Sequence, residues 1–120
     1  MSEQQTEAME AEGGPGECCG GAAPVDDDLL RRDVELLGAL GNDTRYELLR
    51  RIAGTDGGVC VCELEAAVGV SQSAVSQALS RLFGAGLVTR RKDGSWRYYE
   101  TTETAEAVLD TLDDVRRDRD

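Results

Sequence analysis

The 120-residue sequence has no histidine, only one lysine and no long apolar run. Without histidine the chain lacks the commonest general base of enzymes, and no Cys-X-X-Cys motif points to a thiol oxidoreductase. No apolar stretch approaches the roughly 20 residues that a membrane-spanning helix requires. These absences argue against an enzyme and against a membrane protein.

The N-terminus is acidic and glycine-rich, and it lacks the basic and apolar regions of a signal peptide. We therefore expect a cytoplasmic protein, in which thiols stay reduced. Four cysteines in that compartment are better interpreted as ligands or redox groups than as a disulfide framework.

The formal net charge of −11 is unusual for a DNA-binding protein, but the charge is unevenly distributed. Residues 1–35 carry ten acids and two arginines, whereas residues 71–100 carry five basic residues and two acids. Lys92 is the only lysine beside twelve arginines, a usage that resembles that of salt-in halophiles. At molar salt the Debye length is about 3 Å, so an acidic surface would repel DNA little at range.

Two regions follow from composition and periodicity. Residues 1–25 are rich in Glu, Gly and Ala without apolar periodicity, and they predict a flexible acidic arm. The arm contains Cys18-Cys19 between glycines. This pair is either a tethered pair of ligand donors or a product of neutral drift without a function. Residues 26–120 predict a single domain whose core is small enough that dimerisation would stabilise it.

The helices of this domain are predicted from apolar spacing and cap residues. An apolar stripe including Leu30, Val34 and Leu37 predicts a helix from about residue 26 to 40. A second helix follows over residues 42–53, started by the cap-type sequence Asn-Asp-Thr. Its core face is predicted from the following residues: Leu48, Leu49, Ile52 and Ala53.

A helix–turn–helix comes next. A short helix is predicted over residues 60–68, then a tight turn at residues 69–71, with Ser71 as the N-cap of the following helix. In that helix four apolar residues are spaced i, i+3, i+4 and i+7 and should pack inward: Val75, Ala78, Leu79 and Leu82.

The rest of the chain predicts a β-hairpin and a last helix. Residues 87–92 and 95–100 are rich in strand formers, and Asp93-Gly94 suits a two-residue turn. An apolar stripe predicts a helix over residues 102–117. The fold class is thus mainly α with a β-hairpin wing, a winged helix–turn–helix of about five helices. The first and last helices have more apolar face than one small core needs, which favours a dimer interface there.

Polar and basic side chains lie where such a fold would contact DNA. The outward face of the predicted reading helix can pair with base edges and phosphates, and the hairpin can contact phosphates or the minor groove. The predicted DNA-binding residues are Gln72, Ser73, Ser76, Gln77, Ser80 and Arg81 on the helix, and Arg90, Arg91, Lys92 and Arg97 on the hairpin. Trp96, Tyr98 and Tyr99 are expected to pack the hairpin against the body.

Cys60 and Cys62 stand directly before the reading helix. A pair of soft thiolates in this place suggests DNA binding under the control of a ligand, provided that the backbone leaves regular helix so that both sulfurs reach one ion. The alternative is that both are small buried apolar residues, and the spacing alone does not decide between the two.

Four blocks in order, LGNDTRYELLRRI, VCVCEL, VGVSQSAVSQALSRLFGAGLV and RRKDGSWRYYE, resemble the ArsR/SmtB family of metal-sensing repressors over about residues 30–102. The resemblance implies a homodimeric repressor that binds double-stranded operator DNA at an imperfect inverted repeat and leaves it when metal binds. Cys60 and Cys62 match the cysteines of arsenite- and cadmium/lead-responsive members. The third cysteine of the arsenite pattern is replaced by Glu65, and the resemblance implies that Cys18 or Cys19 completes the site.

Three functions follow in order of preference. The first is a repressor released by trivalent arsenic or antimony, and the second is a repressor of the same family that senses cadmium or lead through four thiolates. The third is a regulator switched by a disulfide at Cys60/Cys62 or Cys18/Cys19. The family's zinc site on the last helix is disfavoured, because Asp110 and Asp113 without histidine make a weak site.

Overall fold

The computed structural model describes residues 21–119, and the structural statements below concern these residues. The chain divides into two compact units, Met1–Leu30 and Arg31–Asp120. The predicted domain boundary after residue 25 stays a prediction.

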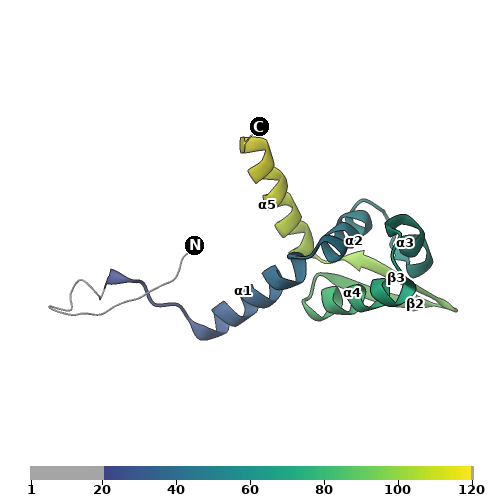
Figure 1. Cartoon of the computed structure of the whole chain (residues 1–120), viewed down its shortest axis with the longest axis horizontal. Coiled ribbons are helices and arrows are strands. Elements are labelled where there is room, and N and C mark those ends of the chain that lie inside the picture. The colour runs from purple at the N-terminus through teal and green to yellow at the C-terminus, as the bar shows by residue number, and fades with distance from the viewer. Residues whose placement is uncertain (1–20, 120) are drawn as a thin grey trace. The chain divides into compact units, whose positions relative to one another are not determined.

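The described residues form five helices and a small antiparallel sheet, the winged helix–turn–helix that the sequence predicts (Figure 1). No helix among them is long and apolar enough to cross a membrane. In chain order the elements are α1 (Asp27–Leu40), α2 (Asp43–Ala53), β1 (Val59–Cys60), α3 (Val61–Val68), α4 (Gln72–Gly84), β2 (Val88–Asp93), β3 (Trp96–Thr101) and α5 (Glu103–Arg119).

Side-chain caps start three of the helices. The side chain of Asn42 accepts a hydrogen bond of 3.0 Å from the backbone N–H of Arg45, and Ser71 accepts one of 3.1 Å from Ala74. Thr102 accepts from Ala105 at the start of α5 and donates to the carbonyl of Gly86 at 2.7 Å. These caps satisfy N–H groups that a helix start leaves without an intrahelical partner. They confirm Asn42 and Ser71 as the helix starts that the sequence predicts.

The core lies between α2, α3, α4 and the sheet. Its largest fully buried side chains include Leu48 and Ile52 of α2, Leu64 of α3 and Leu79 of α4. All four residues predicted to face inward from α4 are buried. Ala53 is exposed, which corrects its prediction as a core residue, because it lies in the last turn of α2 beside the hollow between α2 and α5.

The helix–turn–helix consists of α3, a three-residue turn and α4. Gly69 ends α3 with a φ of 76°, a left-handed conformation that glycine adopts without the steric cost of a Cβ atom. Ser71 caps α4 two residues later. The short turn fixes the direction of α4 relative to α3, so a tilt of α3 would be passed to α4.

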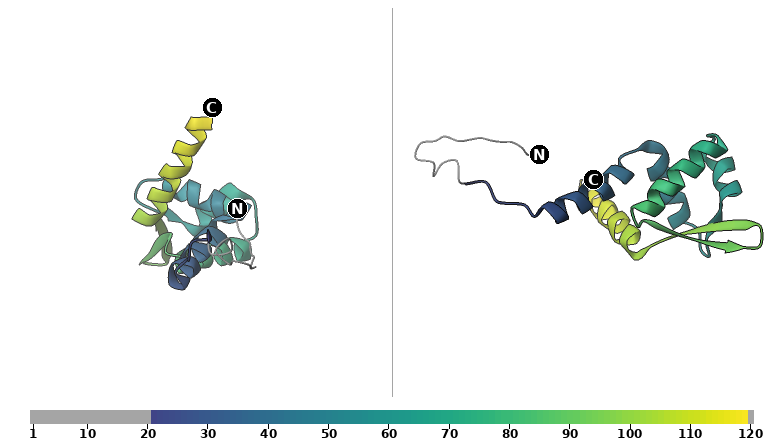
Figure 2. Two further views of the ribbon diagram at one scale, coloured as in Figure 1. Left: turned by 90° about the vertical axis from the view of Figure 1, so that its left-hand side faces the viewer. Right: turned by 90° about the horizontal axis from the view of Figure 1, so that it is seen from below.

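The sheet has the strand order β1-β3-β2, and the two-residue strand β1 is absent from the sequence-based prediction. Val59 pairs with Tyr99, and Cys60 pairs with Tyr98. The hairpin closes where Asp93 pairs with Trp96, so its turn is Gly94-Ser95, one residue later than predicted. Glycine at the first turn position adopts a φ of 64°. Figure 2 shows the hairpin, hereafter the wing, projecting beyond the helices.

Aromatic side chains hold only the base of the wing against the body. Tyr99 is buried and Tyr98 is half-buried, as the sequence predicts. Trp96 is 55% exposed, which corrects its predicted packing, because it follows the turn at the wing tip.

Exposed apolar side chains remain on the first and last helices. Val34 and Leu37 of α1 are 59% and 64% exposed, and Val115 of α5 is 47% exposed. From the end of the sheet, α5 extends away from the α2–α4 body (Figure 1). The core of one chain therefore does not bury this apolar surface, which lies on the two helices predicted to form a dimer interface.

Candidate nucleic-acid interface and thiol site

The outward face of α4 is polar and open to solvent. All six of its predicted DNA-binding side chains are exposed. The face arises because the inward positions of the helix are taken by the apolar stripe, while Ser and Gln occupy the remaining positions of the first turns. It presents hydrogen-bond donors and acceptors without any acidic residue among the helix's 13 residues.

The four basic residues of the wing are exposed, but two of them are held within the protein. The guanidinium of Arg90 lies 4.1 Å from the ring centroid of Phe83. That of Arg91 lies 4.8 Å from the Tyr98 ring and donates a hydrogen bond of 3.1 Å to the carbonyl of Gly57. Cation–π contacts of this kind orient the charge without neutralising it.

A hollow of about 360 Å³ lies between α3, α4 and the wing. Cys62 and Glu65 of α3 line it, together with parts of α4 and the wing. The remaining polar and aromatic groups in its lining are Gln72, Ser76, Ser80, Arg90, Ser95, Trp96, Arg97 and Tyr99. We call this hollow the α3–wing groove. It brings one predicted thiol ligand together with five of the ten predicted DNA-binding residues, and the other five lie outside its lining.

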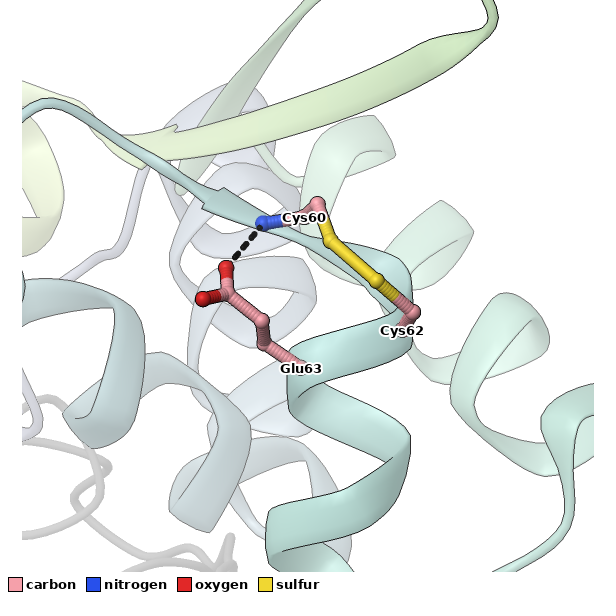
Figure 3. Close-up of a disulfide and its surroundings, with 3 residues drawn as sticks. All are labelled: Cys60, Cys62 and Glu63. Carbon is pink, nitrogen blue, oxygen red and sulfur yellow. Dashed lines mark hydrogen bonds between the residues drawn. A yellow bond between two sulfur atoms is a disulfide. The ribbon is translucent and has the colours of Figure 1, made fainter.

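Cys60 and Cys62 meet at the junction of β1 and α3, where the structure joins them in a disulfide (Figure 3). Cys60 has an extended backbone (φ −86°, ψ 156°) and is the N-cap of α3, and Cys62 lies in the first helical turn. Their Cα atoms are 5.5 Å apart, an ordinary span for two bonded cysteines. Within a regular helix, residues i and i+2 do not face each other. The change from strand to helix takes Cys60 out of the regular helix, as is required if both sulfurs are to reach one ion.

The predicted helix over residues 60–68 thus begins one residue late, at Val61. The backbone N–H of Cys60 donates a hydrogen bond of 3.1 Å to a carboxylate oxygen of Glu63 (Figure 3). Cys60 is buried, with 7% of its surface exposed, whereas Cys62 is exposed. The pair therefore has one sulfur in the core and one accessible from the groove.

Glu65 has an unusual environment on the same helix. One of its carboxylate oxygens, Oε2, is the only buried side-chain nitrogen or oxygen in residues 21–119 that has no hydrogen-bond partner. Buried polar atoms are nearly always paired, so this oxygen calls for an explanation.

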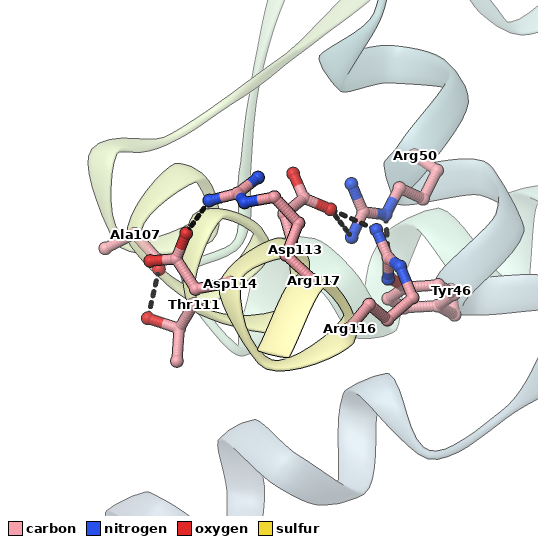
Figure 4. Close-up of polar contacts among 8 residues, drawn as sticks. All are labelled: Tyr46, Arg50, Ala107, Thr111, Asp113, Asp114, Arg116 and Arg117. Carbon is pink, nitrogen blue, oxygen red and sulfur yellow. Dashed lines mark hydrogen bonds and ion pairs between the residues drawn. The ribbon is translucent and has the colours of Figure 1, made fainter. Parts of the chain in front are cut away.

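A second polar cluster joins α2 to α5 (Figure 4). Arg50 donates a hydrogen bond of 3.0 Å to Asp113 and one of 2.7 Å to the hydroxyl of Tyr46. Arg116 pairs with the same carboxylate, and Arg117 pairs with Asp114. The hydrogen bond from Arg50 lowers the pKa of Asp113 below its usual value of 3.8. This carboxylate pairs with two arginines, and the weakness of a metal site on the last helix stays a prediction.

Other predicted ligands lie elsewhere. Cys18 and Cys19 fall outside the described residues. Within residues 21–119 no group of three or more His, Cys, Asp or Glu side chains gathers as a metal site. The described part of the chain therefore supplies two cysteines at the β1–α3 junction, and they would become thiol ligands on reduction of their disulfide.

Two functional features were missed by sequence reasoning. Phe83, which supports Arg90, lies off the apolar stripe of α4, and an aromatic residue in that position was the available signal. Trp96 lines the groove near Cys62, but no local pattern shows that the wing tip and α3 approach each other.

Comparisons with known proteins agree with this architecture. Residues 42–90 match a family model described as "Bacterial regulatory protein, arsR family". The chain is 71% identical over 99 residues to the "Putative arsenical resistance operon repressor ArsR2" of Halobacterium salinarum, covering 82% of this chain and 83% of that protein. It is 51% identical over 90 residues to a second protein of this organism, "Putative arsenical resistance operon repressor ArsR", covering 73% and 68%.

The solved structures that are similar to this chain include a homodimeric winged helix–turn–helix DNA-binding domain, Mb0332 from Mycobacterium bovis. It has a TM-score of 0.70 and 25% sequence identity, and the match covers 82% of this chain and 93% of that domain. Both of the sequence relatives come from Halobacterium salinarum, which supports the halophile origin that the acidic, lysine-poor composition predicts. The family description supports a regulatory protein.

Proposed function

The chain belongs to the arsR family of bacterial regulatory proteins, and on this premise we propose that it is a homodimeric repressor released from operator DNA by trivalent arsenic or antimony. The α3–wing groove carries the proposal, because Cys62 shares it with side chains of the reading helix and the wing. A ligand on the thiolates would lie beside the surface that contacts DNA. Such a regulator acts in the cytoplasm.

For DNA binding, we propose that α4 lies in the major groove. Gln72, Ser76 and Gln77 in its first turns would meet base edges, and glutamine can pair bidentately with adenine. Arg97 and Lys92 of the wing would contact phosphates or the minor groove. Two copies of the chain would bind the halves of an imperfect inverted repeat.

For metalloid sensing, we propose Cys60 and Cys62 as the first thiolate ligands. Trivalent arsenic and antimony are soft centres that prefer sulfur, which explains the need for cysteine. Cys18 and Cys19 are proposed as further donors. A cadmium- or lead-responsive repressor is the alternative, and such an ion would use all four thiolates.

Release would follow from movement of α3. Because Cys60 already lies outside the helix, ligation need not unwind α3 to bring the sulfurs together. A ligand between Cys60 in the core and Cys62 at the groove would instead tilt α3. The three-residue turn would pass this tilt to α4 and misplace its reading face.

The dimer is proposed to form through α1 and α5. Val34, Leu37 and Val115 leave apolar surface on these two helices, and burying such surface in a partner is favourable.

The test is binding of a fluorescent duplex from the protein's own promoter, measured at high KCl with a phosphine reductant. Arsenite, antimonite, cadmium, lead and zinc are titrated separately into wild type and a Cys60→Ser/Cys62→Ser variant. We expect arsenite and antimonite to release wild type, and the variant to bind DNA normally but to remain bound. A Cys18→Ser/Cys19→Ser variant tests the arm separately: weaker release by arsenite would show that an arm thiolate is a donor.

Other outcomes have clear meanings. Release by cadmium or lead alone would move the assignment to the four-thiolate alternative. Release of the Cys60→Ser/Cys62→Ser variant by arsenite would contradict the sensing site.

A second candidate is a thiol redox switch, which the Cys60–Cys62 disulfide favours. Hydrogen peroxide would oxidise the two thiols to a disulfide and be reduced to two waters. If peroxide releases the operator without any metal, and the release is reversed by a phosphine, this function replaces the metalloid sensor.

A further inference from the structure

Glu65, whose Oε2 is unpaired, lies on the same short helix as Cys62. Glu65 follows Cys62 by three residues on α3, so the two side chains project from the same face of the helix. Both line the α3–wing groove. A residue with a buried, unpaired hydrogen-bond acceptor therefore lines the same groove as Cys62.

The chemistry of arsenous acid supplies the missing donor. With the cysteines reduced, As(OH)₃ condenses with two thiols, forming two As–S bonds and releasing two water molecules. No electron is transferred, and arsenic remains trivalent. Where no cysteine of the arm takes the third position, one hydroxyl stays on the arsenic, because residues 21–119 contain only the two cysteines Cys60 and Cys62.

We propose that Glu65 is a specificity-determining residue whose Oε2 accepts a hydrogen bond from this retained hydroxyl. The bond would pair the orphaned oxygen and hold the hydroxyl in the third position around arsenic, without a third cysteine. This inference rests on the proposed function. The hydrogen bond would favour hydroxylated trivalent centres such as arsenous and antimonous acid. It would give no advantage to arsenicals that retain no hydroxyl after condensation with the two thiols.

Two substitutions separate the acceptor from the charge. Glu65→Met and Glu65→Gln both remove the negative charge and keep an unbranched side chain, but only glutamine retains an oxygen acceptor. Both are made in a Cys18→Ser/Cys19→Ser background, so that no arm thiolate can take the third position.

Two probes separate the hydroxyl from the arsenic. Arsenite keeps one hydroxyl after reacting with two thiols. Methylarsonous acid, CH₃As(OH)₂, releases two waters in the same reaction and keeps only its methyl group.

Binding is followed without DNA through Trp96, the only tryptophan, which lines the same groove. Release of the promoter duplex is measured in parallel, with a phosphine as reductant because dithiols would bind the arsenicals.

We expect Glu65→Met to weaken arsenite binding at least about tenfold, equivalent to about 1.4 kcal/mol, relative to the parent. Glu65→Gln should lose less, and methylarsonous acid should bind all three proteins within about twofold. Circular dichroism verifies that each variant is folded, and Glu65→Ala, which also lacks a side-chain oxygen, replaces the methionine variant if that variant is not folded.

Equal arsenite affinity of the parent and Glu65→Met would overturn the role of Glu65 while leaving the metalloid sensor intact. So would loss of arsenite binding in the Cys18→Ser/Cys19→Ser parent, because an arm thiolate would then hold the third position. If full-length wild type responds to neither arsenical, the proposed function itself fails, and this inference fails with it.

Discussion

Arg91 and Arg97 lie on the same wing with the same charge, yet their surroundings differ. Arg91 is held by the carbonyl of Gly57 and the ring of Tyr98. The side chain of Arg97 lines the α3–wing groove and makes no hydrogen bond or ion pair within the described residues. Arg97 is therefore free to contact a phosphate, whereas Arg91 ties the wing to the loop before β1.

We expect Arg97→Ala to weaken operator binding and to reduce the slope of log affinity against log salt concentration by about 0.9, the loss of one phosphate contact. Arg91→Ala should instead lower the free energy of unfolding, by about 0.5–1 kcal/mol for an exposed cation–π contact. Fluorescence anisotropy over a KCl series and thermal melts measure the two effects. An unchanged salt slope in Arg97→Ala would remove this residue from the interface.

Periodicity predicted single-residue exposure well where one helix face decides it. The inward and outward sides of α4 follow directly from its apolar spacing. The contacts of Arg90 with Phe83 and of Arg91 with Tyr98 could not be predicted, because they depend on how the wing crosses the helices. The orphaned oxygen of Glu65 is likewise a property of the packed structure.

At the scale of elements, the contact between α2 and α5 depends on Asp113. Its carboxylate accepts from Arg50 across the two helices, whereas Asp114 pairs only with Arg117 on its own helix. The Arg50 hydrogen bond lowers the pKa of Asp113, so the folded protein holds this group ionised more readily than the unfolded chain does. The resulting stabilisation is present above the usual pKa of 3.8 and is lost as the pH falls through the lower, folded-state value.

We therefore expect Asp113→Asn to cause a small loss of stability at neutral pH, and Asp114→Asn to cause less. The difference between wild type and Asp113→Asn should disappear in acid, below the folded-state pKa. Urea unfolding at low salt across a pH series is the measurement, since molar salt screens exposed pairs. A difference that persists in acid would show that the side-chain shape, and not the charge, matters.

Element boundaries were predicted where caps mark them and missed where the signal is short. Asn42 and Ser71 start their helices as expected. The strand β1 has only two residues and no periodicity of its own, so it forms only because β3 is available as a partner. Its presence is what places Cys60 outside α3, and the thiol geometry therefore depends on an element that the sequence does not reveal.

At the scale of the whole molecule, the proposed function requires an acidic chain to associate with itself and with DNA. The net charge of −11 opposes both, and molar salt shortens the reach of that repulsion to about 3 Å. In the proposed dimer and DNA complex, association would then depend on contact surfaces: the apolar residues of α1 and α5 for a second copy, and the polar face of α4 with the wing for DNA.

Leu37 offers the sharpest test of the dimer because its side chain is 64% exposed on α1. Leu37→Glu would place a charge in an apolar interface, where desolvation is costly. We expect the dimer dissociation constant to rise at least about a hundredfold, equivalent to about 2.7 kcal/mol, with the fold retained. Operator affinity should fall in parallel, because each half-site would then be bound by an independent monomer.

Ala67→Glu is the matched control, since it adds the same charge at an exposed position of α3, a helix that packs mainly against α2, α4 and the sheet. Sedimentation equilibrium at high KCl gives the oligomeric state, and circular dichroism verifies the fold. If Leu37→Glu remains a dimer of wild-type affinity, α1 does not form the interface, and the exposed apolar surface of α5 around Val115 becomes the part to test alone. If Ala67→Glu also dissociates, added negative charge alone disrupts the dimer, and the repulsion of an acidic chain outweighs its apolar contacts even in molar salt.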